Sequence, residues 1–201
     1  MTLYSDRVEP IGHGVRMVLA EKDVNVDVIF ITDEDQPEDL HDLNPYGTLL
    51  TLIDRELVIY EPQVMMEYLD ERYPHPPLMP VDPVSRANNR QVRNRIMRDL
   101  YSLITPIQGR NETSANNARK ALRDNLTAIA PAFSQNTYFM SEEMSLIDCC
   151  MAPLLWRLPH YGVKLPAQAK ALNQYAERMF ARRSFSASMS PQERDLRDSG
   201  K

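Results

Sequence analysis

Residues 74–83 read Pro-His-Pro-Pro-Leu-Met-Pro-Val-Asp-Pro, and five of these ten residues are prolines. Proline fixes the backbone angle φ and removes an amide donor, and it disfavours helix in the residue before it. No helix or strand is expected to persist at this density of proline. The stretch therefore predicts a linker that separates one domain, in residues 1–73, from another, in residues 84–201.

The pattern before the linker alternates between strands and helices. Apolar or β-branched runs predict strands, and runs with apolar side chains on one helical face predict helices. The first helix, 13–22, is expected to expose Arg16 and Glu21. The predicted order is strand 1–4, helix 13–22, buried strand 26–31, a short helix within 32–42, a hairpin of 49–53 and 57–60, and a helix from Pro62 to Arg72. This order is typical of a thioredoxin-like domain with a four-stranded mixed sheet.

Every segment after the linker predicts a helix. Ser145 and Asp148 form a capping box of the Ser-x-x-Asp type ahead of the apolar run 149–156. A helix that is apolar on every side belongs at the centre of its domain. The predicted helices cover 84–104, 116–131, 145–156 and 167–181, and the polar segment 188–201 is expected to fray. The predicted fold class is thus α/β plus all-α, a thioredoxin-like domain followed by an all-helical domain.

The overall composition is that of a soluble globular protein with a net charge of −5. Nucleic-acid-binding proteins usually carry a positive balance, so this charge argues against that class while leaving room for a local basic patch. No apolar stretch approaches the roughly 20 residues that a membrane-spanning helix needs, and no signal peptide precedes Leu3. A cytoplasmic location is expected.

Neither the cysteines nor the histidines form a recognisable metal or catalytic motif. Cys149 and Cys150 are adjacent in an apolar run, which predicts reduced core thiols. The four histidines, His13, His41, His75 and His160, have no metal-ligand spacing with each other or with cysteine or carboxylate residues. We expect no metal and no cofactor, and we expect His13 to cap the first helix or to lie exposed.

Two charged segments stand out. Arg86, Arg90, Arg93, Arg95 and Arg98 crowd the helix after the linker. They form a solvated face, a dimer interface that meets acids such as Asp70 or Glu71 of the partner subunit, or a contact with an acidic protein surface or with nucleic-acid phosphate. Six acids and no lysine or arginine lie in residues 32–42, namely Asp33, Glu34, Asp35, Glu38, Asp39 and Asp42. This second segment is a solvated run or a contact for a basic partner.

Several stretches resemble the glutathione transferase superfamily. They are residues 15–22, Leu43-Asn44-Pro45, residues 66–74, the capping box at 145–148 and residues 178–185. These stretches touch both halves, so the resemblance covers nearly the whole chain. It implies that the thioredoxin-like and helical domains follow the glutathione transferase architecture.

Residues 73–81 and 152–159 more narrowly resemble the stringent starvation protein A family. That resemblance implies a non-enzymatic homodimer that binds RNA polymerase holoenzyme, including sigma factor, and regulates transcription under starvation or stress. It further implies that partners are contacted by Tyr73, Pro74, His75, Pro76 and Pro77, with Asp82 at the rim, where similar proteins tend to carry an aromatic residue. By itself, a proline-rich stretch is equally well explained as a stiff interdomain linker.

Three residues argue against glutathione binding. Gly12 stands where similar proteins place a serine that holds the thiolate, and it has no hydroxyl. Leu50 replaces a cis-proline, and because a non-proline cis bond costs about 2.5–4 kcal/mol we predict a trans bond there. Pro62 replaces a serine whose hydroxyl and N–H would bind the γ-glutamyl carboxylate, and proline lacks both donors.

Two alternatives differ in class. The chain is a glutathione-dependent transferase with residual activity that uses Tyr4 or Ser5 near the end of the first strand, or it is a scaffold of the same fold with an unrelated partner.

Overall fold

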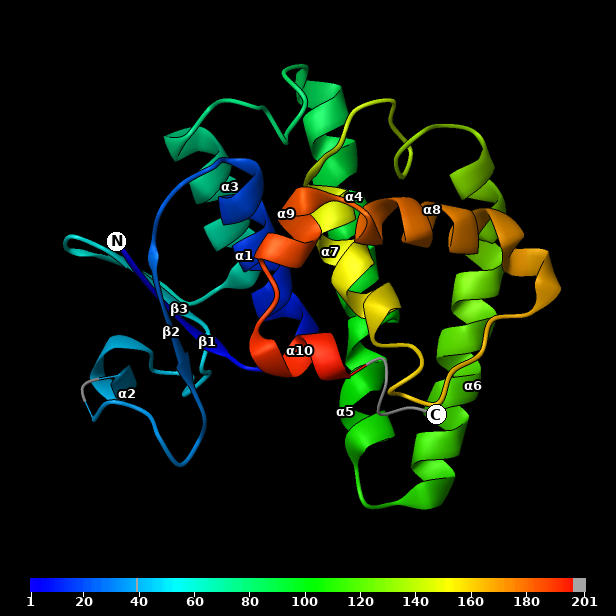
Figure 1. Cartoon of the computed structure of the whole chain (residues 1–201), viewed down its shortest axis with the longest axis horizontal. Helices are drawn as coiled ribbons and strands as arrows, with labels where there is room; N and C mark the ends of the chain where they lie inside the picture. The colour runs from blue at the N-terminus through cyan, green and yellow to red at the C-terminus, as the bar shows by residue number, and fades with distance from the viewer. Residues whose placement is uncertain (39, 197–201) are drawn as a thin grey trace.

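The computed structural model describes residues 1–38 and 40–196. A part that contains the sheet lies beside a part that consists of helices (Figure 1). The N-terminal part contains the mixed sheet and three helices, and the C-terminal part is helical, as predicted. The elements of the first part are β1 (Thr2–Asp6), α1 (Pro10–Glu21), β2 (Asp27–Ile31), α2 (Leu40–Leu43), β3 (Thr51–Asp54), β4 (Leu57–Ile59) and α3 (Pro62–Arg72).

The sheet has four strands in the order β2-β1-β3-β4. β1 pairs parallel with β2 and antiparallel with β3, and β3 and β4 form the predicted hairpin. Leu3 and Leu52 are opposite each other and fully buried on the face covered by α1 and α3. The prediction that β2 is a buried strand is wrong, because β2 is an edge strand and both Asp27 and Ile29 are exposed.

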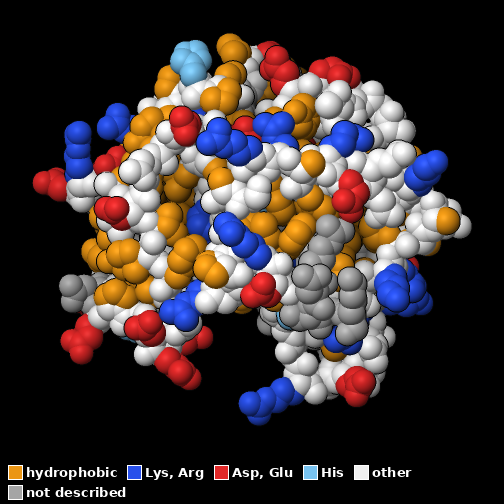
Figure 2. Space-filling model, viewed as in Figure 1, with side chains coloured by type: hydrophobic (Ala, Val, Ile, Leu, Met, Phe, Trp, Pro, Cys, Tyr) orange, Lys and Arg blue, Asp and Glu red, His pale blue; other side chains and the backbone are white. Residues whose placement is uncertain are grey.

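The acidic segment after β2 lies in solvent. Asp33, Glu34, Asp35 and Glu38 are exposed, whereas Leu40, the first residue of α2, is buried. Figure 2 shows acidic side chains gathered at the lower left, where Figure 1 places α2. The predicted acid Asp39 falls outside the described residues.

The elements of the helical part are α4 (Pro83–Asp99), the 3-10 helix η1 (Tyr101–Leu103), α5 (Ile104–Gln108), α6 (Glu112–Ile129), the 3-10 helix η2 (Ala130–Ser134), α7 (Leu146–Trp156), the 3-10 helix η3 (Ala167–Ala169), α8 (Lys170–Phe180), α9 (Arg183–Ala187) and α10 (Pro191–Asp195). The single helix predicted for 84–104 is therefore divided. A new helix beginning at Ile104 places Pro106 in its first turn, where a missing N–H is tolerated. α6 begins earlier than predicted because Asn111 caps it by accepting from the Ser114 N–H at 3.0 Å.

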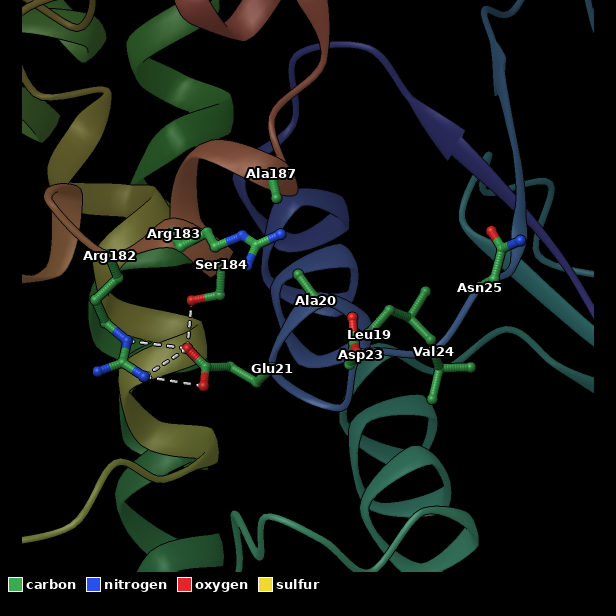
Figure 3. Close-up of a pocket in the computed structure, with 10 residues that line it drawn as sticks. All are labelled: Leu19, Ala20, Glu21, Asp23, Val24, Asn25, Arg182, Arg183, Ser184 and Ala187. Atoms are coloured by element: carbon green, nitrogen blue, oxygen red, sulfur yellow. Dashed lines mark hydrogen bonds and ion pairs between the residues drawn. The ribbon is translucent and has the colours of Figure 1, made fainter.

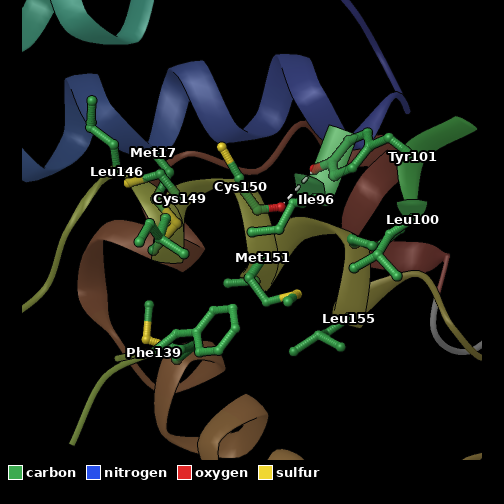
Figure 4. Packing of buried hydrophobic residues seen from close by; sticks show 14 of the residues in the cluster. Met17, Ile96, Leu100, Tyr101, Phe139, Leu146, Cys149, Cys150, Met151 and Leu155 are labelled. Atoms are coloured by element: carbon green, nitrogen blue, oxygen red, sulfur yellow. Dashed lines mark hydrogen bonds between the residues drawn. The ribbon is translucent and has the colours of Figure 1, made fainter. Parts of the chain in front are cut away.

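α7 forms the centre of the molecule, as its apolar sequence predicts. Every residue from Leu146 to Leu155 is buried, and α7 packs against α1, α4 and α8. Figure 4 shows Cys149, Cys150 and Met151 of α7 among Met17 of α1 and Ile96 of α4. The Tyr101 hydroxyl donates to the Cys150 carbonyl at 2.7 Å. Both cysteines are free and buried, so the predicted role as core thiols is confirmed.

The predicted capping box at the start of α7 is present. The Asp148 carboxylate accepts from the Ser145 N–H at 2.8 Å, and the Ser145 hydroxyl accepts from the Ile147 N–H at 3.2 Å. Asp148 also accepts from the Phe139 N–H at 3.0 Å and from the Tyr175 hydroxyl at 2.7 Å. Burial raises the Asp148 pKa to about 6, while these hydrogen bonds act in the opposite direction. One carboxylate thus joins α7, α8 and the preceding loop.

We predict that Asp148→Ala lowers the free energy of unfolding by about 3 kcal/mol, because it removes the cap of α7 and leaves buried hydrogen-bond donors without an acceptor. Urea denaturation measures the change. Asp124→Ala, on the exposed face of α6, is the matched control and should cost less than about 0.5 kcal/mol. Equal stability of the two variants would contradict a central role for Asp148.

α1 is buried along most of its length because it lies between the sheet and α7. It begins at Pro10, whose position in the first turn explains the early start. The expectation that Arg16 is exposed is wrong, because Arg16 is buried. Both alternatives for His13 are wrong too, since it is not exposed and no side chain caps the start of α1. His13 is fully buried, with Nε2 3.0 Å from the Ser188 hydroxyl and its ring 4.7 Å from that of Phe185. Burial, together with the positive charges of Arg157 and Arg16, holds its pKa well below the usual value.

The segment after α9 is anchored by buried residues, namely Ser188, Met189, Ser190 and Glu193, which corrects the expectation that residues 188–201 fray. Ser190 and Glu193 have no exposed surface, and Ser190 caps α10 in a second capping box with Glu193. The Glu193 carboxylate receives both Nη2 of Arg16, at 2.6 Å, and Nη2 of Arg157. Its negative charge compensates two buried guanidinium groups from α1 and the end of α7. Residues 197–201 of this expectation lie outside the described part.

A second ion pair joins the same two regions. Glu21, expected to face solvent, is largely covered, and its carboxylate receives Nε and Nη2 of Arg182, each at 2.9 Å, and the Ser184 hydroxyl. Figure 3 shows Arg182 and Ser184 directed toward Glu21 from the start of α9, beside a hollow of about 770 Å³. The end of α1 is thus fixed to the C-terminal helices.

Glu193→Gln should lower the free energy of unfolding by about 3–5 kcal/mol, since it leaves two buried arginines without their counter-charge. Thermal and urea denaturation monitored by circular dichroism test this. The neighbouring exposed Gln192→Ala serves as the control and should leave stability unchanged within about 0.5 kcal/mol. A Glu193→Gln protein as stable as the control would show that the buried ion pairs contribute nothing.

Candidate functional site

The proline segment, residues 73–82, forms neither helix nor strand between α3 and α4. Pro74, His75, Pro76 and Pro77 are exposed, while Leu78 and Met79 are buried in the core. The Leu78 carbonyl accepts from the Leu146 N–H at 2.9 Å, which ties the segment to the start of α7. The His75–Pro76 peptide bond is cis. The structure therefore exposes the four consecutive residues 74–77, and Leu78 anchors the C-terminal end of this exposed run.

A buried ion pair holds this segment from beneath. The Lys22 Nζ, at the end of α1, lies 2.5 Å from Oδ1 of Asp70 on α3, and both side chains are at least nine-tenths buried. The Lys22 ammonium also donates to the Pro76 carbonyl, and Asp70 accepts from the Leu78 N–H at 2.8 Å. Each charge thus makes one bond to the other and one to the proline segment. This arrangement fixes the backbone on both sides of Pro77.

Tyr73 and Asp82 lie at the two ends of the segment. Tyr73 is half-buried at the end of α3, and the Arg72 guanidinium lies over its ring, 5.8 Å from the centroid. Asp82 is exposed and caps α4 by accepting from the Ser85 N–H at 2.8 Å, which lowers the pKa of its carboxyl. Beside Asp82, Val81 and Val84 are 91% and 68% exposed. Asp82 thus has a structural role as a helix cap at the rim of the exposed prolines.

Three of the five arginines of α4 pair with α3 of the same chain. Arg90 and Arg93 bind Glu67, with Nη2 of Arg90 2.7 Å from Oε2. Arg86 contacts Glu71 at 3.2 Å. Arg93 is 1% exposed, so the interpretation of a wholly solvated face is wrong. Glu71 and Asp70, the acids suggested to meet arginines across a dimer interface, have partners within their own chain.

Gly12, Leu50 and Pro62 are the three positions that argued against glutathione binding. Leu50 is buried and its peptide bond is trans, as predicted, since His75–Pro76 is the only cis bond in the described part of the chain. A Cβ at Gly12 would lie 2.7 Å from the Ser5 hydroxyl and 3.3 Å from Arg16, so this position has no room for a side chain. Pro62 occupies the first turn of α3. The amide and hydroxyl that would bind a carboxylate there are absent from proline.

The two residues of the transferase alternative differ in accessibility. Ser5 is fully buried, where its hydroxyl donates to the Asp6 carbonyl at 3.1 Å and accepts from Arg16. Tyr4 is half-buried and lies opposite Ile29 and Thr51 in the sheet. The buried thiols are poor nucleophiles, since burial raises the Cys150 pKa to about 11 and that of Cys149 well above its usual value.

Over the residues that the structure describes, no three histidine, cysteine or carboxylate side chains come together as metal ligands. Within the same residues, no helix combines the length and apolar composition required to cross a bilayer.

The chain matches two family models, the glutathione S-transferase N-terminal domain over residues 10–72 and the glutathione S-transferase C-terminal domain over residues 92–183. It is 48% identical over 199 residues to the stringent starvation protein A homolog of Coxiella burnetii, which covers 98% of this chain and 95% of that protein. The chain belongs to the stringent starvation protein A family. A second member, from Histophilus somni, is 49% identical over 186 residues, covering 92% of this chain and 88% of that protein.

The stringent starvation protein A family shares its fold with glutathione transferases. Human glutathione S-transferase omega-2 is 30% identical over 171 residues, with 80% of this chain and 68% of that protein covered. BphK, a bacterial glutathione transferase solved as a ternary complex, superposes with a TM-score of 0.85 at 19% identity over the whole of both chains. The resemblance to the transferase architecture is confirmed.

Sequence reasoning for this member of the stringent starvation protein A family missed the residues that support the proline segment. Lys22 and Asp70 are 48 residues apart and each looks like an ordinary charge at a helix end. The sequence held one signal of burial, because Asp70 directly follows Leu69, a residue of the apolar face of the same helix. Such a signal identifies a buried carboxylate but not its partner.

We predict that Lys22→Met destabilises the protein by about 3 kcal/mol, because it leaves the Asp70 carboxylate buried without a counter-ion. Adding Asp70→Asn should restore part of the loss, since the charge then disappears from both partners. Urea denaturation of the single and double variants measures the coupling. Lys170→Met, at an exposed lysine, is the control, and additivity of the two substitutions would argue against a direct pair.

Proposed function

We propose that the protein is a transcription accessory factor that binds RNA polymerase holoenzyme, including sigma factor, and regulates transcription during starvation or stress. The proposed contact is the surface of Tyr73, Pro74, His75, Pro76 and Pro77, with Asp82 at its rim. The observation that carries this proposal is a run of exposed residues whose backbone is held from beneath by the Lys22–Asp70 pair. A surface fixed before binding loses little conformational entropy when a partner docks.

His75 gives this surface a chemical character beyond shape. It is exposed between two prolines, and an imidazole both donates and accepts hydrogen bonds near neutral pH. The flanking pyrrolidine rings are apolar and rigid, which suits them to a shallow protein contact. The chain's membership of the stringent starvation protein A family is consistent with the protein partner that the sequence resemblance implies for this surface.

The proposal also covers assembly, location and chemistry. We propose that the protein works in the cytoplasm as a homodimer. The dimer is supported by Val64 of α3 and Val84 of α4, whose apolar side chains are 52% and 68% exposed and could be covered by a second copy. We propose that the protein works without enzymatic chemistry and without glutathione. Gly12, Leu50 and Pro62 support this, because each removes a feature that glutathione binding requires.

His75→Ala should weaken binding to purified RNA polymerase holoenzyme by about tenfold, the loss expected for one central polar contact. Titration monitored by fluorescence anisotropy, with gel filtration alongside, measures the affinity. His160→Ala removes another exposed histidine, in the turn after α7, and should bind like the unmodified protein.

Each outcome bears on a different part of the proposal. Binding that weakens with His75→Ala alone supports both the partner and the surface. Binding that neither variant changes supports the partner but rejects the proline surface. Absence of binding at micromolar concentrations rejects the polymerase as partner.

A glutathione-dependent transferase is the second candidate, favoured by the 30% identity to glutathione S-transferase omega-2. We predict no turnover of a chromogenic electrophile with glutathione above the uncatalysed rate, since Ser5 is buried and proline stands at position 62. The assay compares the unmodified protein with Tyr4→Phe and Ser5→Ala. Turnover that either substitution abolishes would establish the transferase and reject a purely non-enzymatic role.

A further inference from the structure

A basic groove runs between α6 and the loop that follows α7. Its volume is about 360 Å³. It is lined by Asn116, Arg119, Lys120, Arg123, Gly162, Val163 and Lys164. Four of these seven side chains are cationic and none is a carboxylate, in a chain whose net charge is −5. The local charge of this groove is therefore opposite to that of the whole molecule.

The cations of the groove are available for a ligand. Arg119 is held in place by its own bonds, from Nε to the Tyr161 carbonyl at 2.9 Å and from Nη1 to the Asn116 side chain at 2.9 Å. Lys120 and Lys164 are exposed, and neither has a hydrogen-bond or ion-pair partner within residues 1–38 and 40–196. One arginine is thus pre-positioned and two lysines are free to approach an anion.

Arg123 is only weakly committed to another group. It contacts Asp124 at 3.3 Å, and both side chains are about half exposed. An exposed pair of this kind contributes little, about 0–1 kcal/mol, so an incoming anion can compete for the guanidinium.

The arginines of α4 present the opposite case. The sequence indicated them as a candidate contact for phosphate, but Arg86, Arg90 and Arg93 already form ion pairs with Glu67 and Glu71. The cations of α6 have no such acids in their lining. The groove on α6 is therefore a stronger candidate for an anion-binding site than the arginines of α4.

We infer that this groove binds the phosphate backbone of duplex DNA without reading its sequence. A protein partner would ordinarily add a buried aromatic or aliphatic anchor, yet the apolar lining is Val163, which is itself buried. Single-stranded nucleic acid would call for aromatic side chains on which bases stack, and the lining contains none. Phosphate is bound by charge and hydrogen-bond donors alone, which this lining supplies.

The inference is independent of polymerase binding, so the experiment uses the purified full chain with DNA alone. Fluorescence anisotropy of a labelled 30-base-pair duplex is measured from low to physiological salt. Each phosphate contact adds about 0.9 to the negative slope of log affinity against log salt, so three or four contacts give a slope of about −3. The Lys120→Glu/Lys164→Glu variant should bind at least about tenfold more weakly at low salt and with a shallower slope.

The matched control reverses two exposed charges elsewhere, in the Arg98→Glu/Arg183→Glu variant, which has the same net charge. The groove is supported when the control keeps most of the affinity that Lys120→Glu/Lys164→Glu loses. Equal losses in both variants overturn it, because net charge alone then explains the binding. Absence of duplex binding at low salt, tighter binding to single strands, or binding to poly-glutamate but not to duplex also overturns it.

Discussion

The Glu193 carboxylate, buried between Arg16 and Arg157, is the interaction on which the arrangement of the two domains depends. Arg16 comes from α1 in the first domain, Arg157 from the end of α7 in the second, and Glu193 from α10 near the last described residues. Two buried guanidinium groups need a compensating charge, because the cost of burying an unpaired ion exceeds most single contributions to stability. Glu193 supplies that charge, and its backbone is further fixed where its carbonyl accepts from the Trp156 indole at 2.9 Å.

The same principle accounts for the other junctions between segments. Glu21 receives Arg182 and Ser184, Asp148 joins α7 to α8 and to the loop before it, and Asp70 receives Lys22. Each is a carboxylate that accepts from a donor on another segment of the chain. The apolar core of α7 brings the elements together, and these carboxylates determine which residues meet at their ends.

Much of the fold could be predicted from local pattern. The β-branched runs, the proline-rich stretch and the Ser145–Asp148 capping box each specify structure within a few residues, so the order of strands and helices was readable. The burial of Arg16, His13 and Glu193 was not, because a charged side chain on a helix is indistinguishable from a solvated one until its partner is known. The candidate surface at 74–77 came from resemblance, and its support by Lys22 came only from three-dimensional contacts.

The distance along the chain between Arg16 and Glu193 has a consequence for synthesis. These residues are 177 positions apart, so a ribosome releases the first domain long before it makes the carboxylate that neutralises Arg16. Until then, Arg16 and later Arg157 must remain hydrated, and the interface between α1 and α7 cannot close completely. The junction between α1 and α7 therefore closes completely only after Glu193 is made, 36 residues after Arg157. During that interval the exposed surface of α7 is the part of the chain that chaperones have most to protect.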